Sequence, residues 1–244
     1  MWSVSEDKQP DPSRLLERLD IGLPLIGFYD APEPALFEPL VEPGPGQCVF
    51  CAYENWLEGQ TLHLTKERYG CGGAAGSLFG LQTRPRKEFV KFLADDEGLK
   101  ASQALMEKWI DVRRTYRAEN AHLFIGPLRE SAWPFAKTVT FLVNPDQLAA
   151  LAVGAQYRAA PEDAPPVIAP FGSGCSQLVP FQNLSAAQAS IGSTDIAMRQ
   201  HIPPDVMAFA VTRAMFEQLC ALDERSFLFK PFLDRLKKAR GGRL

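Results

Sequence analysis

Cysteine is the residue type whose spacing suggests chemistry most directly in this chain of 244 residues. Cys48 and Cys51 form a C-x-x-C pair, and Cys71 and Cys175 each lie in a glycine-rich stretch. Four thiolates are the number of ligands that a [4Fe–4S] cluster, a [2Fe–2S] cluster or a structural zinc ion requires. The sequence therefore predicts a metal centre at these four cysteines.

The C-x-x-C pair lies in a segment, residues 47–59, whose apolar residues recur at helical spacing. Three residues along a helix is close to one turn, so both sulfurs should point to the same side. Cys48 would lie in the first turn, where unpaired N–H groups and the helix dipole lower the pKa of a thiol. We therefore expect a thiolate that can bind a metal or attack a disulfide.

The surroundings of the cysteines favour an iron–sulfur cluster over zinc. A cluster needs room and backbone N–H donors for its sulfides, which are most available where side chains are small. Zinc more often takes two C-x-x-C pairs, whereas this chain has one pair and two separate cysteines, so zinc stays the alternative. The glycines expected to contact the bound group are Gly72, Gly73, Gly172 and Gly174.

Two other roles stay open for these cysteines. Free cysteine is among the most buried residue types, so all four side chains could simply pack in the core. The C-x-x-C pair could alternatively be a dithiol that cycles through a disulfide. Cys220 differs from the other cysteines because it lies on an apolar helical stripe, and we interpret it as a packing residue.

A second group of polar side chains follows the last of these cysteines. Ser193, Thr194, Asp195 and Arg199 offer hydroxyls, a carboxylate and a guanidinium that could hold a small anionic ligand. With the glycine-rich loops as backbone donors, they define the rival hypothesis, a metal-free small-molecule-binding protein or enzyme. The alternative is purely structural: Thr194 or Asp195 caps a helix and Arg199 joins an ion pair.

Several function classes are disfavoured. The chain has 26 Lys and Arg against 29 Asp and Glu, which offers no electrostatic attraction to nucleic acid or anionic lipid. Nucleotide loops and serine-hydrolase elbows are absent, and the histidines at 63, 122 and 201 have no partner at helical or hairpin spacing. Without a long apolar run or a signal peptide, we expect a cytoplasmic protein whose cysteines are thiols, and whose partner is a redox protein or a small molecule.

The apolar pattern predicts an α+β fold, with a mixed or antiparallel sheet and packed helices, because strands and helices alternate irregularly. Residues 13–238 should form a single domain between a flexible N-terminus, 1–12, and a flexible tail, 239–244. A cysteine embedded in glycine occurs at both 70–73 and 172–175, which predicts a pseudo-symmetric arrangement of two facing loops. Strands are expected at 23–29, 61–65, 122–125, 138–143, 167–169, 190–196 and 206–211, and helices at 13–20, 47–59, 85–93, 99–119, 145–158, 212–223 and 227–238.

Four motifs resemble one known family. They are Cys48-Val-Phe-Cys51-Ala-Tyr-Glu-Asn-Trp-Leu-Glu-Gly59, Gly70-Cys-Gly-Gly73, Ile168-Ala-Pro-Phe-Gly-Ser-Gly-Cys175 and Gly192-Ser-Thr-Asp-Ile-Ala-Met-Arg199. Together they are similar to the ArCR family, domain of unknown function 169, over roughly residues 13–220. These are prokaryotic proteins without an assigned reaction. The resemblance implies one family-wide unit and a cytoplasmic setting, and it transfers no catalytic residue.

Overall fold

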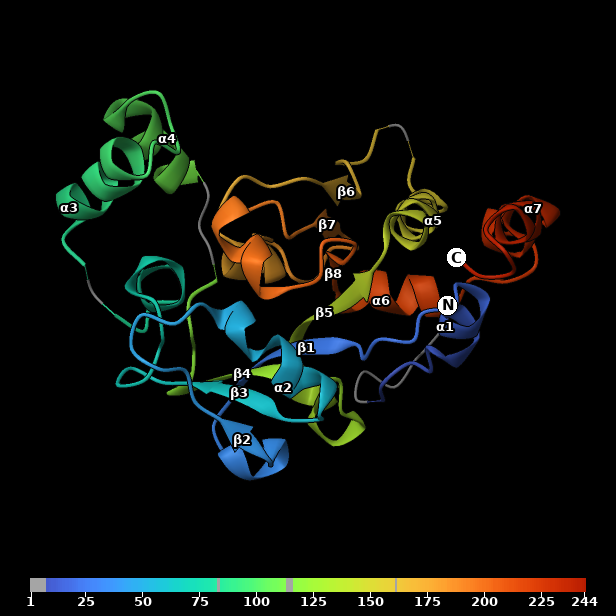
Figure 1. The fold of residues 1–244 in the computed structure, drawn as a ribbon, viewed down its shortest axis with the longest axis horizontal. Coiled ribbons are helices and arrows are strands. Elements are labelled where there is room, and N and C mark those ends of the chain that lie inside the picture. Colours follow the sequence, from blue (N-terminus) through green and yellow to red (C-terminus); the bar gives the residue numbers. More distant parts are fainter. Residues whose placement is uncertain (1–7, 83, 113–115, 161) are drawn as a thin grey trace.

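The computed structural model describes residues 8–82, 84–112, 116–160 and 162–244. The described residues form an eight-stranded mixed sheet, in the order β2-β3-β4-β1-β5-β8-β7-β6 (Figure 1). This confirms the expected α+β class. The strands are β1 (Ile26–Ala31), β2 (Leu40–Val41), β3 (Thr61–Leu64), β4 (His122–Pro127), β5 (Ala136–Val143), β6 (Val167–Ile168), β7 (Ala189–Ile191) and β8 (Met207–Thr212).

The sheet contains the same four-strand arrangement twice. In the first half β1 pairs with β4, β4 with β3 and β3 with β2, and in the second half β5 pairs with β8, β8 with β7 and β7 with β6. The outermost pair is parallel in both halves, and the other pairs are antiparallel. β1 and β5 join the halves as antiparallel neighbours. The topology is therefore pseudo-symmetric about the β1–β5 pair.

One face of the sheet carries the longer helices. Buried side chains from this face, such as Tyr29, Phe141 and Phe209, share a core with residues of the covering helices. The covering elements are α1 (Ser13–Arg18), α5 (Pro145–Gln156), α6 (Arg213–Cys220) and α7 (Pro231–Ala239), with the 3₁₀ helices η1 (Pro34–Phe37), η5 (Glu130–Phe135) and η8 (Phe227–Phe229).

The opposite face is covered by short helical turns that contain or directly follow Cys48, Cys51, Cys71 and Cys175. Phe28, Leu62 and Ile125 point to this side of the sheet and pack in a second core. The covering elements are η2 (Val49–Ala52), α2 (Tyr53–Leu57), the π-helical turn η3 (Gly72–Gly76), η6 (Gly174–Leu178) and η7 (Ile196–His201). Each parallel strand pair needs a crossover, and η2 with α2 provides it in the first half as η6 does in the second.

A helical insert, residues 84–112, separates β3 from β4. It contains α3 (Arg86–Lys91), the π-helical segment η4 (Phe92–Asp96) and α4 (Gln103–Val112), and it projects from the sheet at the upper left of Figure 1. Its helices share a small core of their own, made by Phe89, Val90, Leu93, Ala94 and Met106. The insert is therefore held together largely by its own contacts.

Hydrogen bonds close the base of this insert. The backbone N–H of Ala118 donates to the carbonyl of Phe79 over 2.9 Å, so the chain before and after the insert lies side by side. The carboxylate of Asp30, at the end of β1, is buried and accepts from the Tyr116 hydroxyl, from the backbone of Glu119 at 2.7 Å and from the backbone of Asn120 at 3.0 Å. The side-chain amide of Asn120 adds a further bond at 2.9 Å.

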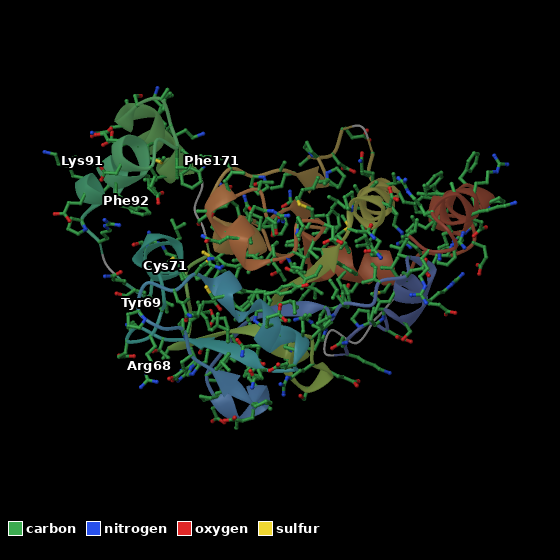
Figure 2. The ribbon with its side chains drawn as sticks, in the orientation of Figure 1. Arg68, Tyr69, Cys71, Lys91, Phe92 and Phe171 are labelled. Atoms are coloured by element: carbon green, nitrogen blue, oxygen red, sulfur yellow. The ribbon has the colours of Figure 1, made fainter. Side chains whose placement is uncertain are left out.

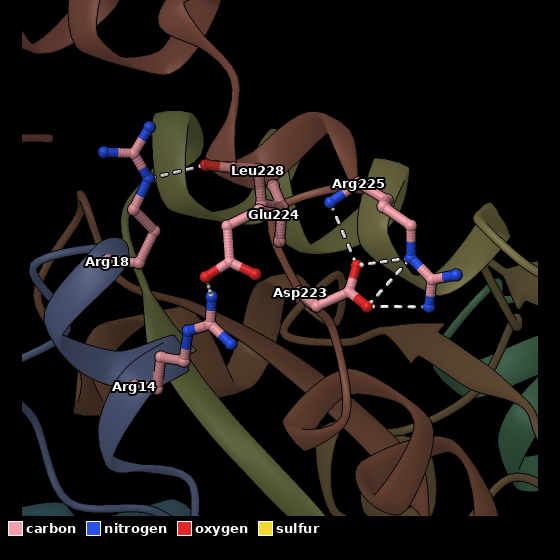
Figure 3. Close-up of polar contacts among 6 residues, drawn as sticks. All are labelled: Arg14, Arg18, Asp223, Glu224, Arg225 and Leu228. Atoms are coloured by element: carbon pink, nitrogen blue, oxygen red, sulfur yellow. Dashed lines mark hydrogen bonds and ion pairs between the residues drawn. The ribbon is translucent and has the colours of Figure 1, made fainter.

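Polar contacts fix the N-terminal helix to the C-terminal part of the chain (Figure 3). Arg14 pairs with Glu224, and the guanidinium of Arg18 donates to the carbonyl of Leu228 at 2.6 Å. In the same segment the guanidinium of Arg225 donates two hydrogen bonds to the carboxylate of Asp223. Helices α1, α5 and α6 consequently share one core cluster with α7. None of the helices described has the length and apolarity needed to cross a membrane.

Several expected elements differ from the observed ones. The long helix expected over 99–119 is observed only as α4, because Asp30 holds residues 116–120 in a non-helical path; residues 113–115 lie outside the described part. The single helix expected over 47–59 is split into η2 and α2, and Cys48 precedes η2 with extended backbone, ψ 144°. The helix expected over 13–20 is observed as α1, and both the backbone N–H and the hydroxyl of Ser13 donate to Asp11.

Candidate functional site

The four cysteines at 48, 51, 71 and 175, called here the four-cysteine site, come from three segments on one face of the sheet. The backbone N–H of Cys71 donates to the carbonyl of Gln47 at 2.9 Å, and Gly46 donates to the carbonyl of Gly70 at 3.1 Å. These bonds fasten the glycine-rich loop beside the segment that leads into Cys48. Sequence reasoning placed these cysteines together, and the structure brings them near enough to one another for their charges to interact.

Gly70 allows this close approach of two backbones. Its φ of +72° is in the left-handed region, and a Cβ at this position would lie 2.5 Å from the carbonyl oxygen of Gln47. A side chain here would therefore displace Cys71 from its position beside Cys48.

Cys48 and Cys51 lie on a 3₁₀ turn. The backbone N–H of Cys51 donates to the carbonyl of Cys48 at 3.0 Å, which closes the turn. Cys48 itself has extended backbone, so the helical geometry from which a common direction of the two sulfurs was expected is absent. The two thiols are still near enough for Cys51 to contribute to the raised pKa of Cys48. Both side chains are partly buried.

Cys175 is buried in η6, which packs against the C-x-x-C segment. A Cβ on Gly174 would lie 2.6 Å from Cγ of Met198 and 3.1 Å from Cε2 of Phe50, so the absence of a side chain lets η2, η6 and η7 touch. The backbone N–H of Gly174 donates to Oδ2 of Asp195 at 2.9 Å. The N–H of Gly174, which was expected to contact a bound group, is therefore bonded within the protein.

The other glycines predicted to contact a bound group have different surroundings. A Cβ on Gly172 would lie 2.7 Å from Oγ of Ser176 and 3.5 Å from Cζ2 of Trp109, so this glycine is packed closely. A Cβ on Gly72 would meet only Oε1 of Gln82, at 3.3 Å. Gly73 belongs to η3, and its burial lies outside what the structure describes.

Electrostatics links the four thiols. The pKa of Cys48 is raised to about 11, chiefly by burial and to a smaller degree by the neighbouring Cys71, Cys51 and Asp195, while the backbone N–H of Phe50 opposes the shift. Burial also raises the pKa of Cys175 well above its usual value, with smaller contributions of the same sign from Cys71 and Cys48. The sulfurs are therefore close enough for the charge on one to affect the next.

The sequence-based expectation of a lowered pKa at Cys48 was wrong. The helix that should have stabilised its thiolate is only the four-residue η2, and Cys48 lies just before its first residue. A dipole this short is weak, and the cost of burying a charged sulfur exceeds it.

Cys51 has a partner that sequence reasoning missed. Its Sγ lies 3.6 Å from Nδ1 and 3.8 Å from Nε2 of His201, which ends η7. The two residues are 150 positions apart, so no local spacing could have revealed the pair. His201 is thus a fifth side chain at the four-cysteine site.

Gln177 is a second residue that the sequence did not indicate. Its side chain is buried, and its amide donates to Oγ1 of Thr194 at 2.6 Å and to the carbonyl of Gly172 at 3.1 Å. Its Oε1 accepts from the backbone N–H of Thr194 at 3.2 Å. Gln177 therefore ties the loop before Cys175 to the loop after β7.

The polar group at 193–199 has a structural role in its observed positions. Asp195 caps η7 by accepting from the backbone N–H of Ala197 at 3.0 Å, as the structural alternative predicted. The guanidinium of Arg199 donates to the backbone carbonyls of Val206 at 2.5 Å and Pro204 at 2.7 Å, and the expected ion pair is not found within the described part of the chain. Ser193 is buried, with a φ of 60° and no hydrogen-bond partner for its hydroxyl within the described residues.

The helical insert contacts the loop that carries Cys175. The ring of Phe171 meets Trp109 edge-on, with centroids 5.1 Å apart, and Lys100 places its Nζ 3.8 Å from the Phe171 centroid. Figure 2 shows Phe171 and Phe92 on the side of the insert, with Cys71 and Tyr69 below them.

Cys220 lies apart from the four-cysteine site. It belongs to α6 and packs against the core on the opposite face of the sheet, in agreement with its interpretation as a packing residue. Burial raises the pKa of its thiol to about 12. Among the residues that the structure describes, no three or more His, Cys, Asp or Glu side chains are grouped closely enough to hold a metal ion.

The fold and the site define a class of protein: a pseudo-symmetric α+β unit whose crossover turns gather cysteines on one face of the sheet. The model of the uncharacterised ArCR family, domain of unknown function 169, matches residues 27–221, and the chain belongs to this family. No curated protein and no solved structure matches the chain.

Proposed function

We propose that this protein binds an iron–sulfur cluster through Cys48, Cys51, Cys71 and Cys175 and acts in electron transfer or redox sensing. The observation that carries the proposal is the convergence of these cysteines from three separate segments, each thiol within electrostatic range of others. Cysteines that serve only to fill a core do not need to lie beside one another. A shared ligand gives their convergence a chemical reason.

The energetics of the thiols agree with a cationic centre. Buried thiols next to one another resist ionisation, as the raised pKa values of Cys48 and Cys175 indicate. Bound iron supplies the positive charge that offsets both the burial and the mutual repulsion of the thiolates. The proposal requires the loops to draw closer around the cluster during loading, because the described side chains are not grouped tightly enough for a metal ion.

The rival hypotheses gain less support. The anion-binding hypothesis relied on Arg199, whose guanidinium is committed to backbone carbonyls. A dithiol redox pair needs one thiol with a low pKa, whereas burial raises the pKa of Cys48. Zinc would use the same four thiolates in a structural role.

Purification without oxygen tests the proposal. The protein should be brown, with broad visible absorption, and should contain stoichiometric iron and acid-labile sulfide. Replacing Cys48 or Cys51 by serine should abolish iron binding, because a hydroxyl is a hard and poorly ionised ligand.

Cys220→Ser provides the matched control, since it makes the same change at a partly buried cysteine on the other face of the sheet. It should keep its iron and lose about 1–3 kcal/mol of unfolding free energy. A colourless wild type, zinc in place of iron, or full iron content in Cys48→Ser would refute the proposal.

A further inference from the structure

The C-terminal segment, residues 225–244, concentrates positive charge that the net charge of the chain conceals. It holds seven Lys and Arg and one Asp, whereas the rest of the chain holds 19 Lys and Arg against 28 Asp and Glu. The balance of the whole chain, from which no attraction to anionic lipid is expected, therefore does not describe this segment. Such an asymmetry of charge is typical of a region that meets an anionic partner.

Only some of these cations are neutralised within the protein. Three have acidic partners, in the pairs Arg225–Asp223, Lys237–Asp20 and Arg240–Asp146. Within the described residues no ion pair involves Lys230, Arg235 or Lys238, and all three side chains are exposed. These three cations are therefore available to an anion outside the chain.

Two exposed phenylalanines lie among these cations. Phe227, in η8, is 42% exposed, and Phe232, in α7, is 58% exposed. Their rings stack with centroids 5.8 Å apart, and the guanidinium carbon of Arg235 lies 5.1 Å from the Phe232 centroid. Large apolar side chains that are grouped on the surface and bordered by positive charge are typical of an interaction surface.

Helix α7 turns these side chains outward at one end of the molecule, the right-hand end in Figure 1. Leu233 is buried in the core beneath the helix, whereas Phe232, Arg235 and Lys238 occupy exposed positions three residues apart. Residues at this spacing are neighbours on the surface of a helix. The basic-aromatic surface, as it is called below, consists of Phe227, Lys230, Phe232, Arg235 and Lys238.

We propose that the basic-aromatic surface binds this protein peripherally to membranes that contain anionic lipid. The cations would face the lipid phosphates, and the rings of Phe227 and Phe232 would enter the boundary between headgroups and acyl chains. Opposite charge supplies the attraction, and the removal of the two rings from water strengthens it. This inference goes beyond the iron–sulfur proposal and does not depend on it.

Other occupants fit this surface less well. A single-stranded nucleic acid needs free ring faces for base stacking, whereas the Phe232 ring is already contacted by Phe227 and Arg235. A second copy of the chain in a two-fold dimer would bring the same cations together, and like charges repel. A lipid surface needs only projecting apolar side chains and positive charge.

Co-sedimentation of the whole chain with lipid vesicles tests the proposal. Equimolar phosphatidylglycerol and phosphatidylcholine vesicles should bind the protein at least about tenfold more tightly than pure phosphatidylcholine vesicles, because only the former are anionic. Raising NaCl from about 0.1 M to about 0.5 M should weaken the binding, since salt screens exposed charges.

Variants locate the binding on the basic-aromatic surface. Phe232→Ala should weaken binding to the anionic vesicles about tenfold, because the ring is no longer transferred from water. Arg235→Ala/Lys238→Ala should weaken it about 25-fold, since each cation near an anionic surface contributes about fivefold. Circular dichroism checks that each variant is folded, and Phe227→Ala provides a second ring variant.

Matched controls lie on the helical insert, at the opposite end of the molecule in Figure 1. Leu105→Ala removes an apolar side chain that is 49% exposed, and Lys87→Ala/Lys91→Ala removes two exposed cations. Both control variants should bind the anionic vesicles as tightly as the wild type does.

Three outcomes would overturn the proposal. The first is a wild-type protein that does not bind the anionic vesicles, and the second is a loss of binding in the controls equal to that in the surface variants. The third is Phe232-dependent binding of a labelled oligothymidylate without binding of vesicles, which would assign the surface to nucleic acid.

Discussion

Asp30→Ala should destabilise the protein more than any single surface change, because this carboxylate closes the base of the helical insert. Its side chain is 1% exposed and accepts hydrogen bonds from Tyr116, Glu119 and Asn120. The Tyr116 hydroxyl is buried and would lose its partner, which costs about 2 kcal/mol. The other three donors are partly buried and can bind water, so we expect about 2 kcal/mol for them together.

Urea unfolding followed by circular dichroism measures the effect. With a slope of about 3 kcal/mol/M, a loss of about 4 kcal/mol lowers the unfolding midpoint by roughly 1.3 M. Tyr116→Phe removes one of the four hydrogen bonds and should cost about 1–2 kcal/mol. Asp234→Asn, at the exposed ion pair with Arg18, should leave the midpoint unchanged within error.

A loss below about 1 kcal/mol in Asp30→Ala would refute the reasoning, because it would mean that the donors are satisfied equally well by water. An equal loss in Tyr116→Phe and Asp30→Ala would show that only the hydroxyl contact matters.

Gly70→Ala should lower the free energy of unfolding by about 2 kcal/mol more than Gly59→Ala. Both glycines have positive φ, but only at Gly70 would a Cβ meet a backbone atom, the oxygen of Gln47. Thermal unfolding of both variants measures the difference, and equal losses would contradict the prediction. Burial, aided by His122, lowers the pKa of His63, so the unfolded chain takes up a proton near pH ~6.5 before the folded protein does. The free energy of unfolding should therefore fall from pH 7 toward pH 5, and urea titrations should show a shallower fall in His63→Asn; parallel curves would rule this out.

The parts of the fold that local pattern determines were predicted well. β3 was expected at 61–65 and is observed at Thr61–Leu64, because its alternating residues and the preceding Gly59 are local signals. The helix that begins at Pro145 was also expected, because proline is favoured at the first helical position. Asn144, directly before it, caps this helix. These elements need no information from distant residues.

The elements that failed depend on distant partners. The expected helix over 99–119 ends early because Asp30, far away in the sequence, takes the N–H groups of Glu119 and Asn120. Helix propensity alone cannot anticipate such a competitor. The repeated motif of a cysteine among glycines, at 70–73 and 172–175, was assigned to the wrong pair of loops. In the observed topology the crossover with Cys175 corresponds to the crossover with Cys48 and Cys51, not to the loop at 70–73.

The candidate site shows the same division. The four cysteines could be grouped from residue type and spacing, since thiols are few and their chemistry is specific. Gln177 and His201 could not, because a glutamine or histidine in a loop is common and only the folded chain brings them to Thr194 and Cys51. The commitment of Arg199 to carbonyls was likewise invisible in the sequence.

The closed base of the helical insert makes this part of the chain a suitable place for engineering. The backbone hydrogen bond from Ala118 to Phe79 keeps the two ends of the insert together, so the length of chain between them should have little effect on the sheet. Doubling the length of a flexible loop costs only about 0.6 kcal/mol. Gly98, between η4 and α4, is exposed, and a Cβ there would meet nothing within 4 Å. A reporter domain inserted at Gly98 would thus be carried by the same insert that contacts the Cys175 loop through Trp109 and Lys100, and the sheet should still fold.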